Sequence, residues 1–256
     1  MSVAWCKVAR VIAAKLPVIL EPENSELAVA LLRDYFAPPD GRGSDFRGAQ
    51  FERLGRPWND ERYANKITAS DIVALNCLGV EVPGDVSIAL LGPDTEPVQK
   101  LLAQIPPDLD LWEATDAQIG AHAPARELWS YLRRPGMGQT ATGKMMARKR
   151  SRLVPVYDPI IGAELGLKNP GAHWEAMRNL LNEKVGPNGI PLHEHLVELG
   201  KKAGLDTELV TPLRIFDVAV WYFGNPKLAK RVAWVAQDHG AKVPERPPFA
   251  APPEDY

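Results

Sequence analysis

Residues 135–158 read PGMGQTATGKMMARKRSRLVPVYD, and this stretch decides how the fold is interpreted. Pro135 to Gly138 form a Pro-Gly-x-Gly sequence that predicts a tight turn, because glycine tolerates backbone conformations that other residues avoid. A helix is expected directly after the turn, and it ends in a basic run. Asp158 precedes Pro159, an order typical of a helix N-cap and the first helical position. The stretch therefore predicts a turn, a basic helix and an aspartate at the start of the next helix.

The rest of the chain predicts a series of short helices. Leucine and aromatic residues recur at helical spacing over residues 25–36, with Ser25 as the cap, and Thr68 begins a second helix. Residues 80–91 fit a strand or a helix, because a Pro-Gly pair interrupts the pattern. Further helices are expected over residues 96–105, 115–134, 158–166, 171–185, 191–203, 207–223 and 226–239.

These patterns predict an all-α fold class, a two-lobed helical domain with a helix–hairpin–helix motif. We expect one such domain over residues 1–242, with the hairpin and its following helix at about residues 124–166. Residues 243–256 are rich in proline and poor in aliphatic residues, so we expect them to form a disordered tail. A cleft between the two lobes is the expected place for a substrate.

Composition excludes several classes of protein. The hydrophobic fraction of 45% and the charged fraction of 24% are ordinary for a globular protein. Cys6 and Cys77 are too few for a disulfide framework or a four-thiolate metal site, so we expect a reduced, cytoplasmic location. We expect no membrane-spanning helix, because no run of about 18 uncharged apolar residues occurs. The histidine spacing and the lack of a nucleotide-binding loop lead us to expect no metal and no cofactor.

The distribution of charge is more informative than the net charge of −2. From Leu128 to Tyr157 there are 30 residues without one Asp or Glu, where the overall composition predicts about four. Arginines and lysines are frequent in the same window. Such a basic segment can bind a nucleic-acid backbone, or it can pair with acidic side chains elsewhere in the fold. The sequence leaves both interpretations open.

The turn itself is a candidate phosphate site. The first N–H groups of a helix have no partner within the helix and lie at the positive end of its dipole, so they bind anions without a basic side chain. A Pro-Gly-x-Gly turn that merely joins two helices is the alternative.

The order of hairpin, basic helix and aspartate resembles the helix–hairpin–helix DNA glycosylases of the endonuclease III type. Those proteins carry a Leu-Pro-Gly-Val-Gly-like hairpin, a helix, and a Val-Asp-like segment with the catalytic aspartate. The corresponding residues here are Arg134-Pro135-Gly136-Met137-Gly138 and Val156-Tyr157-Asp158. The likeness covers roughly an eighth of the chain. Residues 143–158 also resemble an uncharacterised bacterial family.

The resemblance implies a function and a set of residues. Asp158 would be the catalytic carboxylate that breaks an N-glycosidic bond after the target base leaves the duplex. Thr140 occupies the position of the family's imine-forming lysine, which implies a monofunctional enzyme that uses water. The implied partner is DNA, and the predicted DNA-binding residues are Gly136, Gly138, Gln139, Thr140, Lys144, Arg148 and Lys149. The candidate aromatic walls for the base, which fit a helical core equally, are Trp112, Trp129 and Tyr131.

Asp217 lies in an apolar helical segment, where a carboxylate needs a partner. Arg214, one helical turn away, and the basic segment 148–152 are its two candidate partners. We interpret Asp217 as an ion-pair member, or as a catalytic acid if it faces the cleft. Two other functions remain open: a non-catalytic DNA-binding module of the same fold, and a helical protein-interaction domain whose basic stretch serves internal packing. The sequence does not indicate the oligomeric state.

Overall fold

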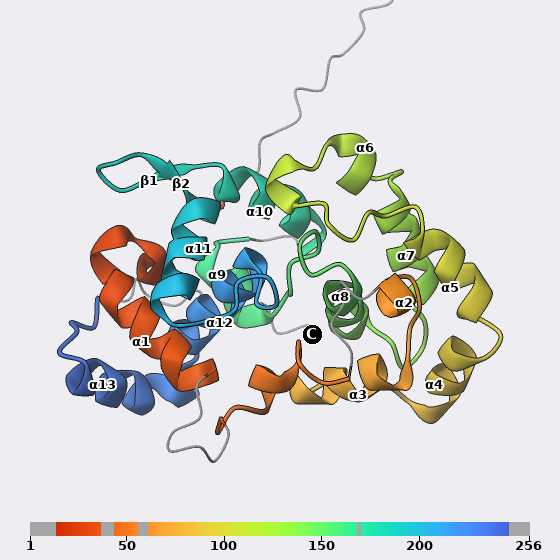
Figure 1. Cartoon of the computed structure of the whole chain (residues 1–256), viewed down its shortest axis with the longest axis horizontal. Helices are drawn as coiled ribbons and strands as arrows, with labels where there is room; N and C mark the ends of the chain where they lie inside the picture. Colours follow the sequence, from red (N-terminus) through yellow and green to blue (C-terminus); the bar gives the residue numbers. More distant parts are fainter. Residues whose placement is uncertain (1–13, 37–43, 56–60, 168–169, 246–256) are drawn as a thin grey trace, which may run out of the picture.

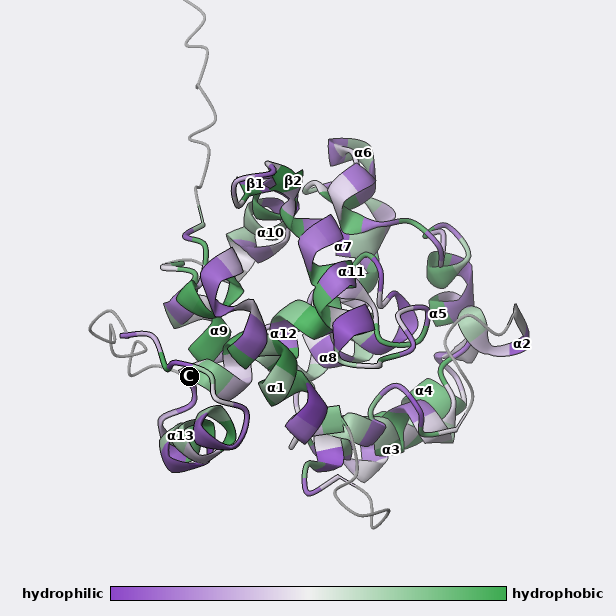
Figure 2. Cartoon of the chain, turned by 60° about the vertical axis from the view of Figure 1, so that its left-hand side comes forward, coloured by the Kyte–Doolittle hydropathy of each residue, from purple (hydrophilic) through white to green (hydrophobic). Residues whose placement is uncertain are grey.

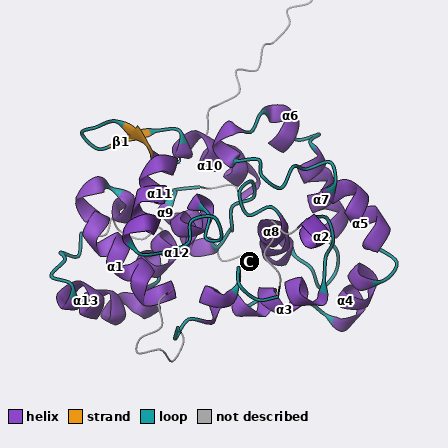
Figure 3. Ribbon diagram, viewed as in Figure 1, coloured by secondary structure: helices purple, strands orange, loops and turns teal. Residues whose placement is uncertain are grey.

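The computed structural model describes residues 14–36, 44–55, 61–167 and 170–245, and the described chain is mostly helical (Figure 1, Figure 3). Its one sheet is a short antiparallel ribbon of β1 (Lys184–Val185) and β2 (Ile190–Pro191). The structure therefore confirms the all-α class. The ribbon was not predicted, because two-residue strands leave no alternating pattern in the sequence.

The first part of the chain contains η1 (Val18–Leu20), η2 (Pro22–Asn24), α1 (Ser25–Phe36), η4 (Arg47–Gln50), α2 (Glu61–Ala64), α3 (Ala69–Cys77), α4 (Gly84–Leu91), α5 (Thr95–Leu102), η5 (Leu111–Glu113), α6 (Asp116–Ile119) and α7 (Pro124–Leu132). The second part contains α8 (Gln139–Lys149), α9 (Pro159–Glu164), η6 (Pro170–Ala172), α10 (His173–Leu181), α11 (Leu192–Lys202), α12 (Pro212–Gly224), η7 (Pro226–Leu228) and α13 (Ala229–Asp238).

Several expected boundaries agree with these elements. Helix α1 has the predicted bounds, and α3 begins after Thr68, whose side chain forms a capping box with Asp71. Residues 80–91, for which the sequence fitted either a strand or a helix, contain helix α4. The single helix expected over residues 115–134 is two helices, because Pro124 starts a new helix after a glycine turn. Of the expected tail, residues 243–245 have no regular structure and the remainder lies outside the described residues.

The helices pack in two groups that meet near α8. Helices α1, α9, α11, α12 and α13 contact one another, with α1 against α11, α12 and α13. Helices α3, α4, α5 and α7 form a second series, in which α3 and α7 both contact α8. Figure 1 shows α8 between the elements of the two groups. Whether these groups are separate lobes of one domain stays a prediction.

Helix α8 places polar side chains in the interior. Every residue from Ala141 to Arg150 is buried, and Figure 2 shows hydrophilic parts of α8 among the surrounding helices. Arg148 and Lys149 are each 2% exposed, and Arg150 is fully buried. Cations are costly to bury unless their N–H groups find acceptors. In this protein the acceptors are mainly main-chain carbonyls from the first part of the chain.

Arg150 illustrates this arrangement. Its guanidinium donates to the carbonyls of Ile105 at 2.7 Å and Ala64 at 2.8 Å, and also to the carbonyl of Leu102. It donates further to the side-chain oxygen of Asn65 at 2.6 Å. Burial lowers the pKa of Arg150 to about 10. The side chain therefore fastens α8 to the ends of α2 and α5 by hydrogen bonds alone.

Replacing Arg150 by Met is expected to lower the free energy of unfolding by about 3–5 kcal/mol, because buried carbonyls lose their donors. The matched control is Arg152→Met, which removes a partly exposed guanidinium paired with Asp110 and should cost about 1–2 kcal/mol. Urea unfolding of both variants measures the difference. A similar loss in the two variants would contradict a special role for Arg150.

Candidate active site

Asp158 is held at the start of α9. It is the N-cap residue of this helix, and its Oδ1 accepts the Ile160 N–H at 2.9 Å. The side chain is half-buried and is not sealed in the core. Its other oxygen has no hydrogen-bond partner among the described residues. The predicted cap is therefore confirmed, and one carboxylate oxygen remains free for other contacts.

The residues around Asp158 fix its position. The Tyr157 ring packs edge-on against the His173 ring, with centroids 5.1 Å apart. Gly162 allows the Tyr157 hydroxyl to approach, since a Cβ at this glycine would lie 2.7 Å from that oxygen. The neighbouring Val156 is buried. The turn that presents Asp158 is thus supported by packing on several sides.

Asp158 lines a cavity of about 370 Å³. This volume lies in the range of small-molecule sites. The walls come from α1, the segment around η4, the end of α3, α8, the start of α9, and α12. The lining residues are Tyr35, Asp45, Phe46, Arg47, Gly48, Cys77, Leu78, Gly79, Lys144, Val156, Asp158, Arg214, Asp217, Val218 and Trp221.

Lys144 enters this cavity from α8. The side chain is 7% exposed, and its Nζ donates to the Leu78 carbonyl at 2.9 Å. Burial lowers the pKa of Lys144, while the negative charges of Asp158 and Asp217 act in the opposite direction. The lysine therefore lies close enough to both carboxylates for their charges to act on it.

Arg214 and Asp217 form a buried ion pair on α12 and both line the cavity. Arg214 also pairs with Glu52 at 2.7 Å and donates to the Gly48 carbonyl at 2.8 Å. Burial raises the pKa of Asp217, and Arg214 opposes this effect. The expected ion pair of Asp217 is present, and of its two candidate partners the structure shows Arg214. Asp217 also lines the cavity, which is the position for which we interpreted it as a candidate catalytic acid.

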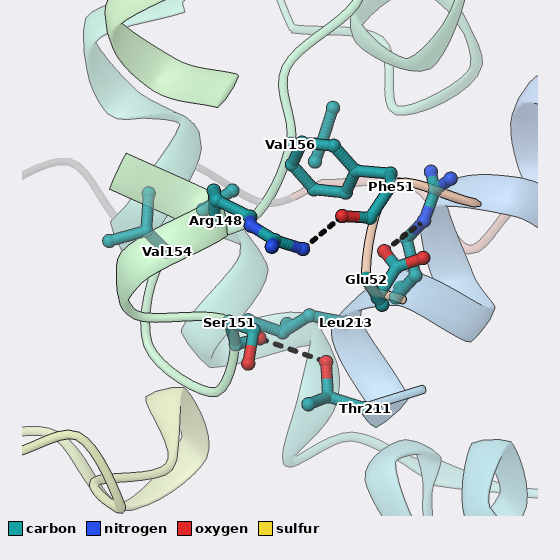
Figure 4. A pocket seen from close by; sticks show the side chains of 10 residues that line it. Phe51, Glu52, Arg148, Ser151, Val154, Val156, Thr211 and Leu213 are labelled. Carbon is teal, nitrogen blue, oxygen red and sulfur yellow. Dashed lines mark hydrogen bonds and ion pairs between the residues drawn. The ribbon is translucent and has the colours of Figure 1, made fainter. Parts of the chain in front are cut away.

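A much smaller pocket shares Val156 and Arg214 with the lining of the cavity (Figure 4). Its volume is about 20 Å³, which is room for little more than one water molecule. Arg148 donates to the Phe51 carbonyl across it, and the Thr211 hydroxyl donates to the Ser151 carbonyl at 2.8 Å. This pocket belongs to the packing of the site and is too small for a substrate.

The Pro-Gly turn lies on the surface at the other end of α8. Arg134 and Met137 exchange two main-chain hydrogen bonds, and Gly136 has a φ of 79°, which favours glycine. Gly138 is the N-cap of α8 and has no side-chain cap. The turn opens on a surface hollow that shares no lining residue with the cavity. Gln139 begins α8 five residues before Lys144, about 7.5 Å along the axis.

The structure places two of the predicted DNA-binding residues in the interior. Arg148 and Lys149 are buried, and both bind Asp71 at 3.0 Å. They also donate to main-chain carbonyls, Arg148 to Phe51 and Lys149 to Tyr63. The acid-free window therefore contains cations whose partners lie far away in the sequence, and its basic run serves internal packing. Lys144 is buried in the cavity wall and does not lie on an outer DNA-binding face.

The remaining predicted positions differ in their surroundings. Gly136 and Gly138 are exposed, and Gln139 and Thr140 are half-buried at the start of α8. The three aromatic residues suggested as walls of a base pocket do not line the cavity. Its aromatic walls are Tyr35, Phe46 and Trp221. Sequence reasoning missed them because they come from three segments and share no motif.

No group of three or more His, Cys, Asp or Glu side chains is placed to hold a metal ion in the described part of the chain. None of its helices combines the length and apolar character needed to cross a membrane.

Comparison with known families gives a match over most of the chain. The model of a family of unknown function, DUF6308, matches residues 28–224. The chain belongs to this family. The matched region extends from α1 through α12, so it contains every residue that lines the cavity of this DUF6308 member. No curated protein and no solved structure matches the chain.

The packing around Asp158 predicts a pH dependence of stability. Burial lowers the pKa of His173 from 6.5 to about 4. Between these values the unfolded chain binds a proton that the folded protein does not, so stability falls as the pH falls through this range. Acidification from about pH 7 to 4.5 should cost about 2.5 kcal/mol through His173 alone. Urea unfolding at both pH values should show a correspondingly smaller loss for His173→Gln. Equal losses would contradict a neutral, buried imidazole.

Proposed function

We propose that this protein hydrolyses an N-glycosidic bond in DNA, with Asp158 as the catalytic carboxylate and water as the nucleophile. The observation that carries the proposal is that Asp158 lines an open cavity although it also caps a helix, and that its second oxygen has no partner among the described residues. A capping aspartate with no other role needs no such cavity. A reduced, cytoplasmic location is part of the proposal and rests on the cysteine content.

The reaction places two demands on the site. Water adds to C1′ of the sugar, the bond from C1′ to the base nitrogen breaks, and the base leaves with the bonding electrons and takes a proton. A carboxylate beside the sugar can stabilise the positive charge that develops there, or accept the proton of the water. The base needs an enclosed space after it leaves the stack. Asp158 and the adjoining cavity of about 370 Å³ match these two demands.

The turn at residues 135–138 supplies the proposed backbone contact. The N–H groups at the start of α8 lie beside exposed glycines and the exposed Arg133. Arg134 is largely neutralised, because it pairs with Asp94. Burial of Arg148 and Lys149 reduces the charge available for DNA. We therefore propose a contact to few phosphates, with weak binding and a shallow dependence on salt.

The same burial supports the interaction-domain hypothesis as a second candidate, because that hypothesis assigns the basic stretch to internal packing. It predicts neither DNA binding at low salt nor base release. The two candidate functions therefore predict different results in assays of DNA binding and of base release.

Asp158→Asn is expected to reduce base release from damaged duplex DNA by at least about 100-fold, because the amide cannot act as a base or stabilise positive charge equally well. Asparagine caps helices as well as aspartate does, so the fold should be kept. The control is Asp45→Asn, which removes another cavity carboxylate and should keep most of the activity. Base release that is equal in wild type and Asp158→Asn would remove Asp158 from the mechanism.

Thr140→Glu is expected to weaken binding of a labelled duplex at low salt by about tenfold, because it places a negative charge beside the proposed phosphate site. A glutamate in the first turn of a helix is itself favourable, so unfolding cannot explain a loss of binding. Thr140→Gln is the matched neutral control, and fluorescence anisotropy measures both. Unchanged affinity in the glutamate variant would exclude the start of α8 as the backbone contact.

A further inference from the structure

Two buried side chains in the cavity have hydrogen-bonding capacity that the described protein does not use. Lys144 uses one of its three N–H donors in the hydrogen bond to the Leu78 carbonyl. Asp217 is 5% exposed and binds Arg214 through Oδ2. No further partner of either side chain is present among the described residues. The pair thus offers two free donors and one free acceptor atom to an occupant of the cavity.

The charges around the cavity favour a neutral occupant. Arg47, Lys144 and Arg214 are balanced by Asp45, Asp158 and Asp217 in the same lining. An anion such as phosphate would meet as many carboxylates as cations. A neutral molecule with both donors and acceptors leaves this balance intact.

The aromatic and aliphatic residues of the walls favour a flat ring. Tyr35, Phe46 and Trp221 line the cavity together with Val156 and Val218. The rings of Tyr35 and Phe46 stack with centroids 4.8 Å apart, and Trp221 meets Tyr35 edge-on at 6.3 Å. Aromatic walls of this kind bury planar heterocycles well.

We propose that Lys144 and Asp217 recognise the lactam edge of a nucleobase, in which a carbonyl oxygen adjoins a ring N–H. Lys144 donates to the carbonyl oxygen, and Asp217 accepts the ring N–H. The oxygen has two lone pairs for the two free donors, and the ring nitrogen has one hydrogen for the free acceptor. A base with an exocyclic amino group, such as cytosine or adenine, has the opposite pattern. It presents two N–H donors beside a ring nitrogen that has one lone pair.

This inference rests on the proposed function in one respect, because it assumes that the molecule in the cavity is a nucleobase. Lys144 and Asp217 then select the base, while Asp158 acts on the sugar. The preferred substrates carry uracil-like or hypoxanthine-like rings, and cytosine and adenine are disfavoured. A buried polar site rejects an analogue that leaves its groups unpaired by a large factor.

Calorimetric binding of free methylated bases tests the inference without any chemistry. The probes are 1-methyluracil, 1-methylcytosine and 1,3-dimethyluracil, in which the ring N–H is blocked. We expect 1-methyluracil to bind at least about tenfold more tightly than the other two. Equal affinities, or no binding of 1-methyluracil, would overturn the proposal. This comparison uses the unaltered protein, so it does not depend on whether a variant folds.

Variants assign the two contacts. Lys144→Met and Asp217→Asn should each reduce the preference for 1-methyluracil to about threefold or less. Lys100→Met, on an exposed lysine paired with Glu96, is the control and should change nothing. A preference retained in both cavity variants would overturn the assignment. Binding of 1-methyluracil without base release from DNA would reject the proposed function alone, and base release without the binding preference would reject this inference alone.

Discussion

The cations at the end of α8 bind main-chain carbonyls of the first part of the chain, and the arrangement of the other helices depends on these contacts. Burying a guanidinium or an ammonium group is costly, and hydrogen bonds must offset that cost. Arg148, Lys149 and Arg150 find these bonds in segments between residues 51 and 105. A hydrophobic helix in the same place could not satisfy those carbonyls. The polar contacts therefore determine which segments pack against α8.

The candidate site is connected to this framework through a short series of contacts. Arg148 binds the Phe51 carbonyl, and the next residue, Glu52, pairs with Arg214. Arg214 in turn binds the Gly48 carbonyl and the Tyr35 hydroxyl, which belong to the cavity wall. Packing and site are thus not independent, and an altered α8 would also displace the cavity wall. Substitutions of residues that line the cavity are therefore better probes of function than substitutions of Arg148, Lys149 or Arg150.

Local features of the fold followed from the sequence, whereas contacts between distant residues did not. The capping role of Thr68, the bounds of α1 and the pairing of Asp217 with Arg214 depend on residues within one or two helical turns. The basic window was ambiguous because Asp71, the partner of Arg148, lies 77 residues away. The cavity walls combine α1, η4 and α12, and no local pattern relates their aromatic side chains. Charge alone does not reveal whether a cation is exposed.

The contacts of the Asp71 carboxylate affect the order in which the chain can fold during its synthesis. It closes the capping box of α3 and also binds Arg148 and Lys149. Arg148 follows Asp71 by 77 residues, which is about 4 to 15 seconds of translation at ordinary rates. During that interval the carbonyls later bound by α8 lack the side-chain donors of Arg148, Lys149 and Arg150. The contacts between Asp71 and α8 can therefore form only after α8 has left the ribosome, when more than half of the protein has been made.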